Sequence, residues 1–488
     1  MIKLRKLLSP LPEIEVKGTK DLEITGITAH SKSVAPGNLF VAKRGETYDG
    51  HQFITEAVAA GAVAVLTDLA DPFLEITQLI HPETEKMGTL LAAEYHHHPS
   101  KKLKVVGVTG TNGKTTTTYL IKHLLDQKNF LTGLIGSIDW VVGNNRYPSK
   151  MTCPDPITGQ KLLHEMVDAG CSAVAMEASS HGLDQKRCEG IHFDAAVFTN
   201  LSQDHLDYHK TMDAYLEAKT KLFTSLSPGQ KGILNRDDPV YDRLSPKVGG
   251  DLFTYGIDAC ADLMAKDLKI TPKGVGFTAS YLGNEMRFQS TMRGRFNIYN
   301  LLAAISVGLC FGFSLEEMAP LLRRVPSIPG RLEPVKNKLG LHIFVDFAHT
   351  PDALSSVLQA LREEKKGKLI TLFGCGGERD QDKRAKMGAV VSQFSDEAVV
   401  TSDNPRGEDP ELITRDILKG LAPSLSFEVE LDRRRAIEKA IKRGESGDTI
   451  LIAGRGHESV QLVEGRAIPF SDADVASEIC TSQELISR

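Results

Sequence analysis

The residues from Thr109 to Thr116 have the composition of a phosphate-binding turn. The strand-like run Val105–Val108 leads into this turn, and helix-compatible residues follow from Thr117. Glycines let backbone N–H groups converge on phosphate oxygens, a lysine adds a cation, and a threonine hydroxyl can bind Mg²⁺ at a helix N-terminus. Val108 stands where the usual loop has its first glycine, so this loop is a variant. The pattern predicts a site for phosphate and its metal ion.

Two further polar groups follow apolar strands. Glu177 ends the run Ala173–Met176, where a carboxylate can reach Mg²⁺. The segment from Asn200 to His209 is too polar and too rich in histidine for an ordinary core turn, and His205 is a candidate ligand for a second cation. A carboxylate after a strand more often caps a helix, but the phosphate-binding turn favours the metal interpretation.

These residues need strands that bring them to one edge of a sheet. After residue 99, short apolar strands such as Ala195–Phe198 alternate with helices, which predicts a largely parallel sheet covered by helices. Beyond residue 331 the same alternation predicts a second doubly wound sheet, with strands at 343–346, 369–373, 398–401 and 449–453. The first ninety or so residues indicate a small α/β module, with a helix over 53–60 and a strand over 62–66.

The length supports this division. At roughly 150 residues per domain, 488 residues predict about three domains. Composition changes near Pro99, and the prolines in Val325–Arg331 interrupt the helical pattern of Leu301–Leu322. The expected domains are residues 1–98, 99–331 and 332–488.

Composition excludes several classes of protein. The 58 Lys and Arg residues against 63 Asp and Glu residues give a net charge of −5, so no net positive field exists to hold nucleic acid. The longest apolar run, Ala57–Leu66, is far shorter than the ~20 residues of a membrane helix, and the start lacks a signal sequence, so a cytoplasmic location is expected. The seven cysteines form no CxxC motif, and most of them are expected to be small buried hydrophobic residues. His96–His98 is expected to begin a solvated linker rather than to bind a metal.

Several motifs, in this order along the chain, resemble the Mur ligase family, the ATP-dependent amino-acid-adding enzymes of peptidoglycan synthesis. They cover all three expected domains, which makes the resemblance more specific than any single motif. The matching segments are Gly110–Thr115, Glu177–His181, Asp204–His209, Glu217–Lys219, Phe296–Asn300, Gly330–Glu333 and Asp346–Asp352.

Within that family, Asp403–Arg406 and Gly454–Glu458 resemble the branch that adds meso-diaminopimelate. The resemblance implies ATP-dependent ligation of meso-diaminopimelate to UDP-N-acetylmuramoyl-L-alanyl-D-glutamate through an acyl phosphate, in the cytoplasm. It also implies an N-terminal uridine-nucleotide module, a central ATP-binding domain, a C-terminal Rossmann-like domain and Mg²⁺ as cofactor. No nucleic-acid or membrane partner and a monomeric state are expected.

The resemblance also implies roles for individual residues. Lys114, Glu177, His205 and Lys219 would be catalytic, with Thr115, Glu177, His205 and carbamylated Lys219 as metal ligands. ATP would contact Gly110, Thr111, Asn112, Gly113, Lys114, Thr115, Thr116, Asn300, Arg331, Asp346 and His349. The nucleotide-sugar acceptor would contact Ser31, the loop from Thr47 to His51, Thr152, Ser179, Gln185 and Arg187. Diaminopimelate would contact Arg379, Asp403, Asn404, Arg406, Gly454 and Glu458.

The sequence departs from the family pattern at a few positions, and other functions stay open. His30 and Lys32 flank Ser31 where Asp and Arg are usual, and Phe347, Glu378 and Arg455 replace Tyr, Asp and Lys. The alternatives are a lysine-adding relative, a folylpolyglutamate synthase, and a nucleotide switch without ligase activity. A ligase should release phosphate only with acceptor and amino acid present, whereas a switch should not need them.

Overall fold

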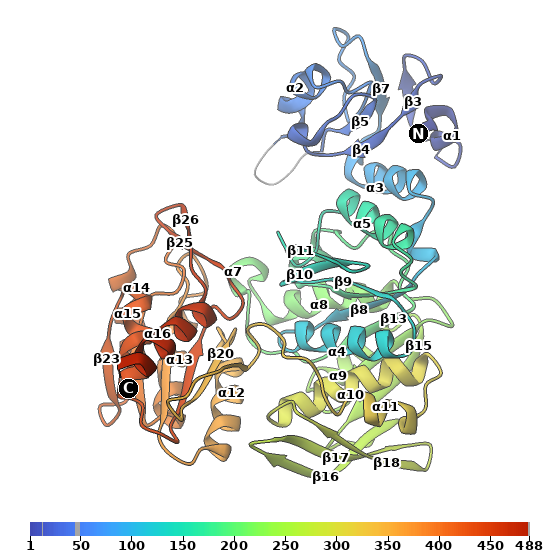
Figure 1. Ribbon diagram of the computed structural model, residues 1–488. Helices are drawn as coiled ribbons and strands as arrows, with labels where there is room; N and C mark the ends of the chain where they lie inside the picture. The colour runs from blue at the N-terminus through green and yellow to red at the C-terminus, as the bar shows by residue number, and fades with distance from the viewer. Residues whose placement is uncertain (12, 44–48, 487–488) are drawn as a thin grey trace. The chain divides into compact units, whose positions relative to one another are not determined.

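The computed structural model describes residues 1–11, 13–43 and 49–486 (Figure 1). The chain forms two compact units. The first contains Met1–Gly107 and Asn129–Asp194, and the second contains Val108–Lys128 and Ala195–Arg488.

The N-terminal part of the first unit is a five-stranded sheet in the order β2-β7-β6-β5-β4. Neighbouring strands are parallel except β2 and β7. Its elements are β2 (Glu15–Lys17), β4 (Gly26–Thr28), η1 (Ser31–Ser33), β5 (Asn38–Val41), η2 (Gly50–Phe53), α2 (Ile54–Ala59), β6 (Ala64–Thr67), β7 (Thr77–Ile80) and α3 (Thr84–Tyr95). Beside it lie α1 (Leu4–Leu8) and the antiparallel pair β1 (Ile2–Lys3) and β3 (Glu23–Ile24).

The alternation of side chains along β5 explains why helices cover both faces of this sheet. Leu39 and Val41 join one hydrophobic core with residues of α1 and α3. Phe40, on the opposite side of the strand, joins another core with Ala57 of α2. Because consecutive apolar residues of a strand point to opposite faces, both faces of the sheet must be covered here.

The remainder of the first unit has the strand order β11-β10-β9-β12-β8. Strands β9 and β12 are parallel, whereas β9, β10 and β11 form antiparallel pairs. The elements are η3 (Pro99–Lys101), β8 (Lys104–Thr109), β9 (Thr132–Ile135), β10 (Asp139–Val142), β11 (Asn145–Pro148), α5 (Pro156–Asp168), β12 (Ala173–Glu177) and α6 (Ser180–Asp184).

In the second unit the order is β8-β13-β14-β15-β16-β17-β18, where β13 to β16 are parallel and β16 to β18 antiparallel. Helix α4 follows β8 and packs against α10. The elements are α4 (Lys114–Gln127), β13 (Ala195–Phe198), α7 (Leu206–His209), α8 (Met212–Thr224), β14 (Lys231–Asn235), α9 (Tyr241–Leu244), η4 (Ser245–Lys247), β15 (Asp251–Gly256), β16 (Leu263–Thr271), β17 (Gly274–Tyr281), β18 (Asn284–Ser290), α10 (Arg295–Cys310) and α11 (Leu315–Leu321).

The C-terminal residues of the second unit form a six-stranded sheet, β19-β20-β24-β21-β22-β23, in which only the pair β19 and β20 is antiparallel. Its elements are β19 (Glu333–Val335), β20 (His342–Asp346), α12 (Pro351–Glu364), β21 (Leu369–Phe373), α13 (Lys383–Phe394), β22 (Glu397–Val400), α14 (Pro410–Leu418), β23 (Ser426–Val429), α15 (Arg433–Arg443), β24 (Thr449–Ala453) and α16 (Asp472–Ile486). The hairpin of β25 (Val460–Val463) and β26 (Arg466–Pro469) precedes α16.

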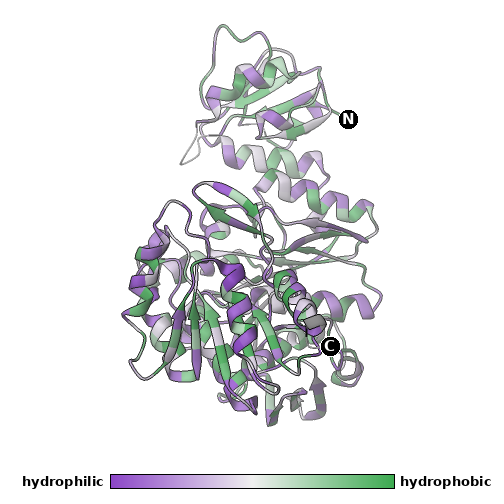
Figure 2. Cartoon of the chain, turned by 60° about the vertical axis from the view of Figure 1, so that its left-hand side comes forward, coloured by the Kyte–Doolittle hydropathy of each residue, from purple (hydrophilic) through white to green (hydrophobic). Residues whose placement is uncertain are grey.

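This sheet is doubly wound, as expected. Leu451 and Ala453 of β24 pack with α12, α13 and α14, whereas Ile450 and Ile452 pack with α15 and α16. Apolar colour accordingly marks the strands, and polar colour marks outward helix faces (Figure 2). The predicted α/β fold with a large, mostly parallel central sheet is confirmed.

The helical pattern over Leu301–Leu322 contains two helices rather than one. The pattern over Leu301–Leu322 is divided between α10 and α11. Gly312 takes a positive φ of 87°, and Ser314 begins α11 with a capping box to Glu317. Apolar spacing alone does not reveal this stop, because a glycine end and a serine start leave the helical period almost unbroken.

Most cysteines are buried, as expected: five of the seven are, whereas Cys260 is exposed and Cys310 is half-buried. Among the residues described, no helix combines the length and apolar character needed to cross a membrane.

The expected solvated linker at His96–His98 is wrong for His96. Its side chain is 8% exposed and lies 4.9 Å, ring to ring, from His164 of α5. Burial, followed by the nearby positive charges of His164, Lys161 and His97, lowers the pKa of His96 to about 4, against an opposing effect of Asp168.

We therefore predict acid sensitivity of the first unit. An unfolded His96 gains a proton near pH 6.5 and the folded one only near pH 4, so its contribution to stability is complete above pH 6.5 and is lost as the pH falls toward 4. By pH 5 this loss should be about 1 to 2 kcal/mol. The thermal unfolding temperatures of wild type and His96→Phe at pH 7.5 and pH 5 measure it. The variant should be more stable relative to wild type at pH 5 than at pH 7.5. A difference in unfolding temperature that is the same at both pH values would contradict the role of His96.

Candidate functional site

The turn after β8 is shaped by one close approach. Gly110 has φ +148°, and a Cβ there would lie 1.9 Å from Thr199 Oγ1, so only glycine fits. The turn is also fixed from Asn200, whose carbonyl accepts from Thr111 N at 2.8 Å and whose Oδ1 accepts from Asn112 N at 2.9 Å. The predicted turn thus leads directly into α4, which begins at Lys114.

Two lysine ammonium groups converge on the carbonyl of Gly110. Lys114 Nζ donates to it at 3.0 Å and to Thr111 O at 2.8 Å. Lys219 Nζ, on α8, donates to Gly110 O at 2.8 Å and lies 4.3 Å from the ring centre of Tyr215. Lys219 is 1% exposed, whereas an ordinary surface lysine of an amphipathic helix would reach water. The structure therefore brings both predicted catalytic lysines to the turn.

Arg331 connects the turn to the C-terminal part of the unit. Its guanidinium donates to Thr115 Oγ1 at 2.9 Å and lies 4.7 Å from the ring centre of Phe347. Phe347, which stands where Tyr is usual, therefore gives Arg331 an aromatic face to pack on. Asn112 Nδ2 also donates to Asp352 Oδ2 at 2.9 Å.

The predicted residues Asp346 and His349 follow β20. Asp346 accepts from Leu332 N at 2.6 Å and Ala348 N at 2.8 Å, and its burial raises the pKa of this carboxyl against the effect of Arg331. His349 Nδ1 is 2.8 Å from Phe347 O, and burial lowers the pKa of its imidazole. Asp346 therefore fixes the turn that presents Arg331 and His349.

Asn300 packs directly against the turn. A Cβ on Gly113 would lie 2.4 Å from Asn300 Oδ1, and Thr117 Oγ1 donates to the same oxygen at 3.3 Å. Asn300 Nδ2 donates to Asn297 Oδ1 at 2.9 Å. Asn300 is thus held one helical turn into α10, against the turn after β8.

His205 has a left-handed backbone, with φ 55°, and its Nε2 lies 3.4 Å from Asp204 Oδ2. Burial opposes ionisation of Asp204, but the nearby charges of His349, His205 and Lys383 and the His205 N–H lower the pKa of Asp204 to about 2. Within the described ranges, no group of three or more His, Cys, Asp and Glu side chains is arranged around a metal position.

In the first unit, Glu177 is completely buried at the end of β12. Its Oε1 accepts from Ser137 N at 2.8 Å, and its Oε2 accepts from Ser137 Oγ at 3.1 Å. Ser137 Oγ also lies 2.9 Å from Thr152 Oγ1. Sequence reasoning did not identify Ser137, because a lone serine after a strand carries no recognisable pattern.

Four of the predicted acceptor contacts gather around α6. Ser179 caps that helix by accepting from Gly182 N, and Arg187 donates to Gln185 Oε1 and to the carbonyl of Cys153, which follows Thr152. Ser31 lies in η1, and its neighbour His30 approaches Asp155, the cap of α5, at 3.7 Å. Of the predicted loop Thr47–His51, Thr47 and Tyr48 lie outside the described residues.

The predicted amino-acid contacts mostly meet at the ends of β21, β22 and β24. A Cβ on Gly454 would lie 2.6 Å from Asp403 Oδ2, and Asn404 Nδ2 donates to Glu458 Oε2 at 2.7 Å. Arg406 donates through one nitrogen to Gly377 O at 2.6 Å and Asn404 O at 3.4 Å. Arg379 is exposed.

The surroundings of this cluster disfavour the charged forms of Arg406 and Glu458. Burial and the charge of Arg379 lower the pKa of the Arg406 guanidinium. Burial and the charge of Asp403 raise the pKa of Glu458, which its bond from Asn404 partly offsets. A half-buried cation beside a half-buried carboxylate can bind a small molecule that carries both a carboxylate and an ammonium group.

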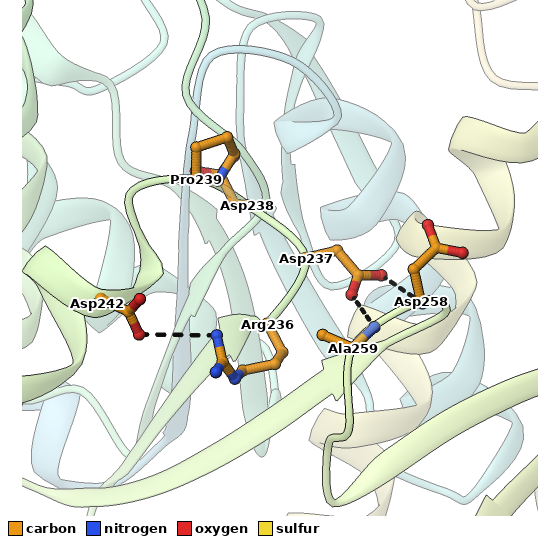
Figure 3. A pocket seen from close by; sticks show the side chains of 7 residues that line it. All are labelled: Arg236, Asp237, Asp238, Pro239, Asp242, Asp258 and Ala259. Carbon is orange, nitrogen blue, oxygen red and sulfur yellow. Dashed lines mark hydrogen bonds and ion pairs between the residues drawn. The ribbon is translucent and has the colours of Figure 1, made fainter.

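A separate pocket of about 450 Å³ lies at the end of β14. Its lining contains none of the predicted residues; it consists of Arg236, Asp237, Asp238, Pro239, Asp242, Asp258 and Ala259 (Figure 3). Asp237 accepts from the N–H groups of Ile257, Asp258 and Ala259 and from Tyr299 Oη at 2.9 Å. Asp237 therefore ties this loop to α10 next to Asn300, a positioning role that the sequence did not reveal.

Comparison with known families places matches in all three parts of the chain. Residues 23–98 match the Mur ligase family, catalytic domain; residues 108–308 match the Mur ligase middle domain; and residues 330–456 match the Mur ligase, glutamate ligase domain.

Full-length relatives are also found. A UDP-N-acetylmuramoyl-L-alanyl-D-glutamate–2,6-diaminopimelate ligase of Chlamydia felis is 40% identical over 464 residues, 94% of this chain and 95% of that protein. One of Bacillus cereus is 38% identical over 488 residues, 99% of each chain. A solved structure of a ligase of that name is 29% identical, with a TM-score of 0.70 and coverage of 99% of both chains.

We predict that Lys114→Ala weakens the binding of ATP on the order of a hundredfold, because the turn loses the cation at its centre. Titration of a fluorescent ATP analogue with Mg²⁺ measures this. Lys122→Ala, two turns along α4, is the matched control, since it removes a lysine that forms an ion pair with Asp126 at 2.8 Å on the same helix. Equal affinities for the two variants, both correctly folded by thermal melting, would remove Lys114 from the site.

Proposed function

This chain belongs to the Mur ligase family, and on that premise we propose that it joins meso-diaminopimelate to UDP-N-acetylmuramoyl-L-alanyl-D-glutamate at the expense of ATP. The family resemblance of the motifs is confirmed. The proposed product is a precursor of peptidoglycan. Support for this substrate pair comes from the relatives named as UDP-N-acetylmuramoyl-L-alanyl-D-glutamate–2,6-diaminopimelate ligases, which align with nearly the whole chain.

One structural observation carries the choice of amino acid. Arg406 is held beside the half-buried carboxylate of Glu458, while its other guanidinium nitrogens make no hydrogen bond among the residues described. Diaminopimelate differs from lysine by a carboxylate on its distal amino-bearing carbon. A planar guanidinium can bind that carboxylate bidentately, and Glu458 can accept from the neighbouring ammonium. We therefore assign the discrimination to Arg406, with Arg379 as a second, more exposed cation.

Amide formation first requires activation of a carboxylate, because hydroxide is a poor leaving group. In the proposed reaction, the γ-phosphoryl of ATP passes to the D-glutamyl side-chain carboxylate. The amino group of diaminopimelate then attacks the acyl phosphate and releases inorganic phosphate. Lys114 and the N–H groups at the start of α4 would neutralise the charge that spreads over the transferring phosphoryl, whereas the N–H groups of Thr111 and Asn112 bind Asn200.

Arg331 and its neighbours would complete the nucleotide contacts. In the structure its guanidinium binds the hydroxyl of Thr115, so it already lies at the turn. Asn300 and His349 offer polar groups from α10 and from the turn after β20, where Asp346 holds the backbone.

The proposed residues fit Mg²⁺ by their chemistry, since Thr115 and Glu177 supply the hard oxygen donors that this ion prefers. Bound there, Mg²⁺ would neutralise phosphate charge during transfer. His205 and a carbamylated Lys219 are the proposed ligands of a second ion. A carbamate forms when the neutral amine of a lysine adds to CO₂, and its nitrogen keeps one N–H. That N–H can preserve the bond to Gly110 O, while the new carboxylate supplies metal ligands.

The acceptor is assigned to the first unit. Thr152, Ser179, Gln185 and Arg187 form one polar cluster beside Glu177, which suits an acceptor whose reacting group is a carboxylate. Ser31 is the proposed contact from the N-terminal sheet. We propose domains at residues 1–98, 99–331 and 332–488, and a monomeric enzyme. We also propose that the reaction takes place in the cytoplasm, because its nucleotide-linked substrates are cytoplasmic metabolites.

The test is phosphate release by the purified chain with ATP, acceptor and a panel of amino acids. We predict release only when acceptor and meso-diaminopimelate are both present, with lysine at least a hundredfold poorer, since lysine leaves the half-buried Arg406 without its anion. Arg406→Ala should remove most of this preference.

Arg415→Ala, on α14, is the control for that variant, because Arg415 is exposed and pairs only loosely with Glu411 at 3.7 Å. Equal use of lysine by the wild type would refute the substrate assignment. A preference that survives in Arg406→Ala would refute the role of Arg406. Phosphate release without acceptor and amino acid would instead support a nucleotide switch.

We also predict that Lys219→Ala lowers ligation on the order of a hundredfold or more and that short carboxylates such as acetate restore part of the activity. The added carboxylate would replace the oxygens of the carbamate. Lys221→Ala, an exposed position on the same helix, should keep wild-type activity. Rates with acetate and with chloride at equal ionic strength distinguish rescue from a salt effect, and an active Lys219→Ala enzyme would end the proposal.

A further inference from the structure

The backbone of Arg406 is held in an unfavourable conformation by a neighbouring hairpin. Arg406 has φ 53°, in the left-handed region that residues with a side chain rarely adopt. Its N–H donates to Leu462 O at 3.1 Å, and its carbonyl accepts from Glu464 N at 2.9 Å. A parallel bridge joins Arg406 to Val463. Strand β25 and Glu464, the residue after it, thus bond to Arg406 on both sides of its Cα.

The same strand holds the two residues that precede the proline of this turn. Gln461 Nε2 donates to Asp403 O at 2.6 Å. Leu462 N donates to Asn404 Oδ1 at 2.8 Å, which leaves the Asn404 amide nitrogen directed at Glu458. The hairpin therefore sets the backbone at Asp403 and Arg406 and the orientation of the Asn404 side chain.

Arg455 fastens the two ends of the hairpin. It is fully buried, and one of its nitrogens donates to Val460 O at 2.6 Å and to Phe470 O at 3.3 Å. Its guanidinium also lies 5.1 Å from the ring centre of Phe470. Val460 begins β25 and Phe470 follows β26, so one side chain spans the base of the hairpin.

We propose that the hairpin Val460–Pro469 positions the amino-acid site, with Gln461 and Arg455 as positioning residues. The inference rests on the proposed function and adds to it a determinant of specificity outside the pocket. Arg406 can meet a carboxylate bidentately only if its backbone stays in the left-handed conformation, because the backbone sets where the side chain starts. The hydrogen bonds from β25 provide that constraint, and Arg455 keeps β25 in place.

The first test is Gln461→Ala, assayed by phosphate release with saturating ATP and acceptor. Loss of the bond to Asp403 should raise the KM for diaminopimelate about three- to tenfold. The kcat and the KM for ATP should stay near the wild-type values. The ratio of kcat/KM for diaminopimelate to kcat/KM for lysine should become smaller. Arg466→Ala, an exposed position on β26, is the matched control and should change neither constant.

The second test compares Arg455→Met with Arg455→Lys. Methionine keeps much of the volume but removes every donor to the hairpin, and it also removes the ion pair with Glu458 at 3.7 Å, so the KM for diaminopimelate should rise more than tenfold. Gln461→Ala leaves that ion pair in place and therefore reports on the hairpin alone. Lysine keeps a cation and a donor for Val460 O, so its KM should lie between those of wild type and Arg455→Met. If Arg455→Met does not fold, Gln461→Ala and Arg455→Lys decide.

The outcomes separate this inference from the proposed function. A wild-type enzyme that does not use diaminopimelate refutes the function itself. An active wild type whose hairpin variants lose stability or kcat, but keep the KM and the amino-acid preference, shows that the hairpin is only structural and overturns the inference. A rise in the KM confined to diaminopimelate supports it.

Discussion

The close packing of Gly110 against Thr199 is the constraint on which the site in the second unit depends. Because Gly110 has no side chain, the turn can pack closely against the end of β13, where Asn200 fixes it. That position leaves the Gly110 carbonyl where Lys114 and Lys219 both reach it. It also starts α4 at Lys114, so that Thr115 meets Arg331. Lys219 from α8 and Arg331, which lie far apart in the sequence, thereby both bring positive charge to this turn.

The amino-acid cluster is built on a different principle, since its side chains hold one another. Asn404 and Glu458 are hydrogen-bonded together, and Gly454 leaves room for Asp403. The doubly wound sheet brings these residues to the ends of neighbouring parallel strands, where ligands of such folds are usually bound. Arg406 then adds a cation on a turn that the hairpin stabilises.

Much of this organisation could be predicted from sequence, because buried parallel strands appear as short apolar runs. The strands 195–198, 369–373 and 449–453 were placed correctly to the residue. Features that depend on contacts between distant segments could not be predicted. His96 is buried by packing against His164, Ser137 meets Glu177 across forty residues, and the hairpin shows its role only through its bonds to Asp403–Arg406. None of these contacts leaves a local pattern.

The central claim is that the acceptor carboxylate is activated as an acyl phosphate, and the fate of its oxygen tests this directly. The acceptor would be prepared with ¹⁸O in the D-glutamyl side-chain carboxylate and turned over once with ATP and diaminopimelate. Formation and aminolysis of an acyl phosphate transfer one of these oxygens to inorganic phosphate. Mass spectrometry of the released phosphate should therefore show one ¹⁸O per molecule. Unlabelled phosphate beside labelled amide product would contradict the account.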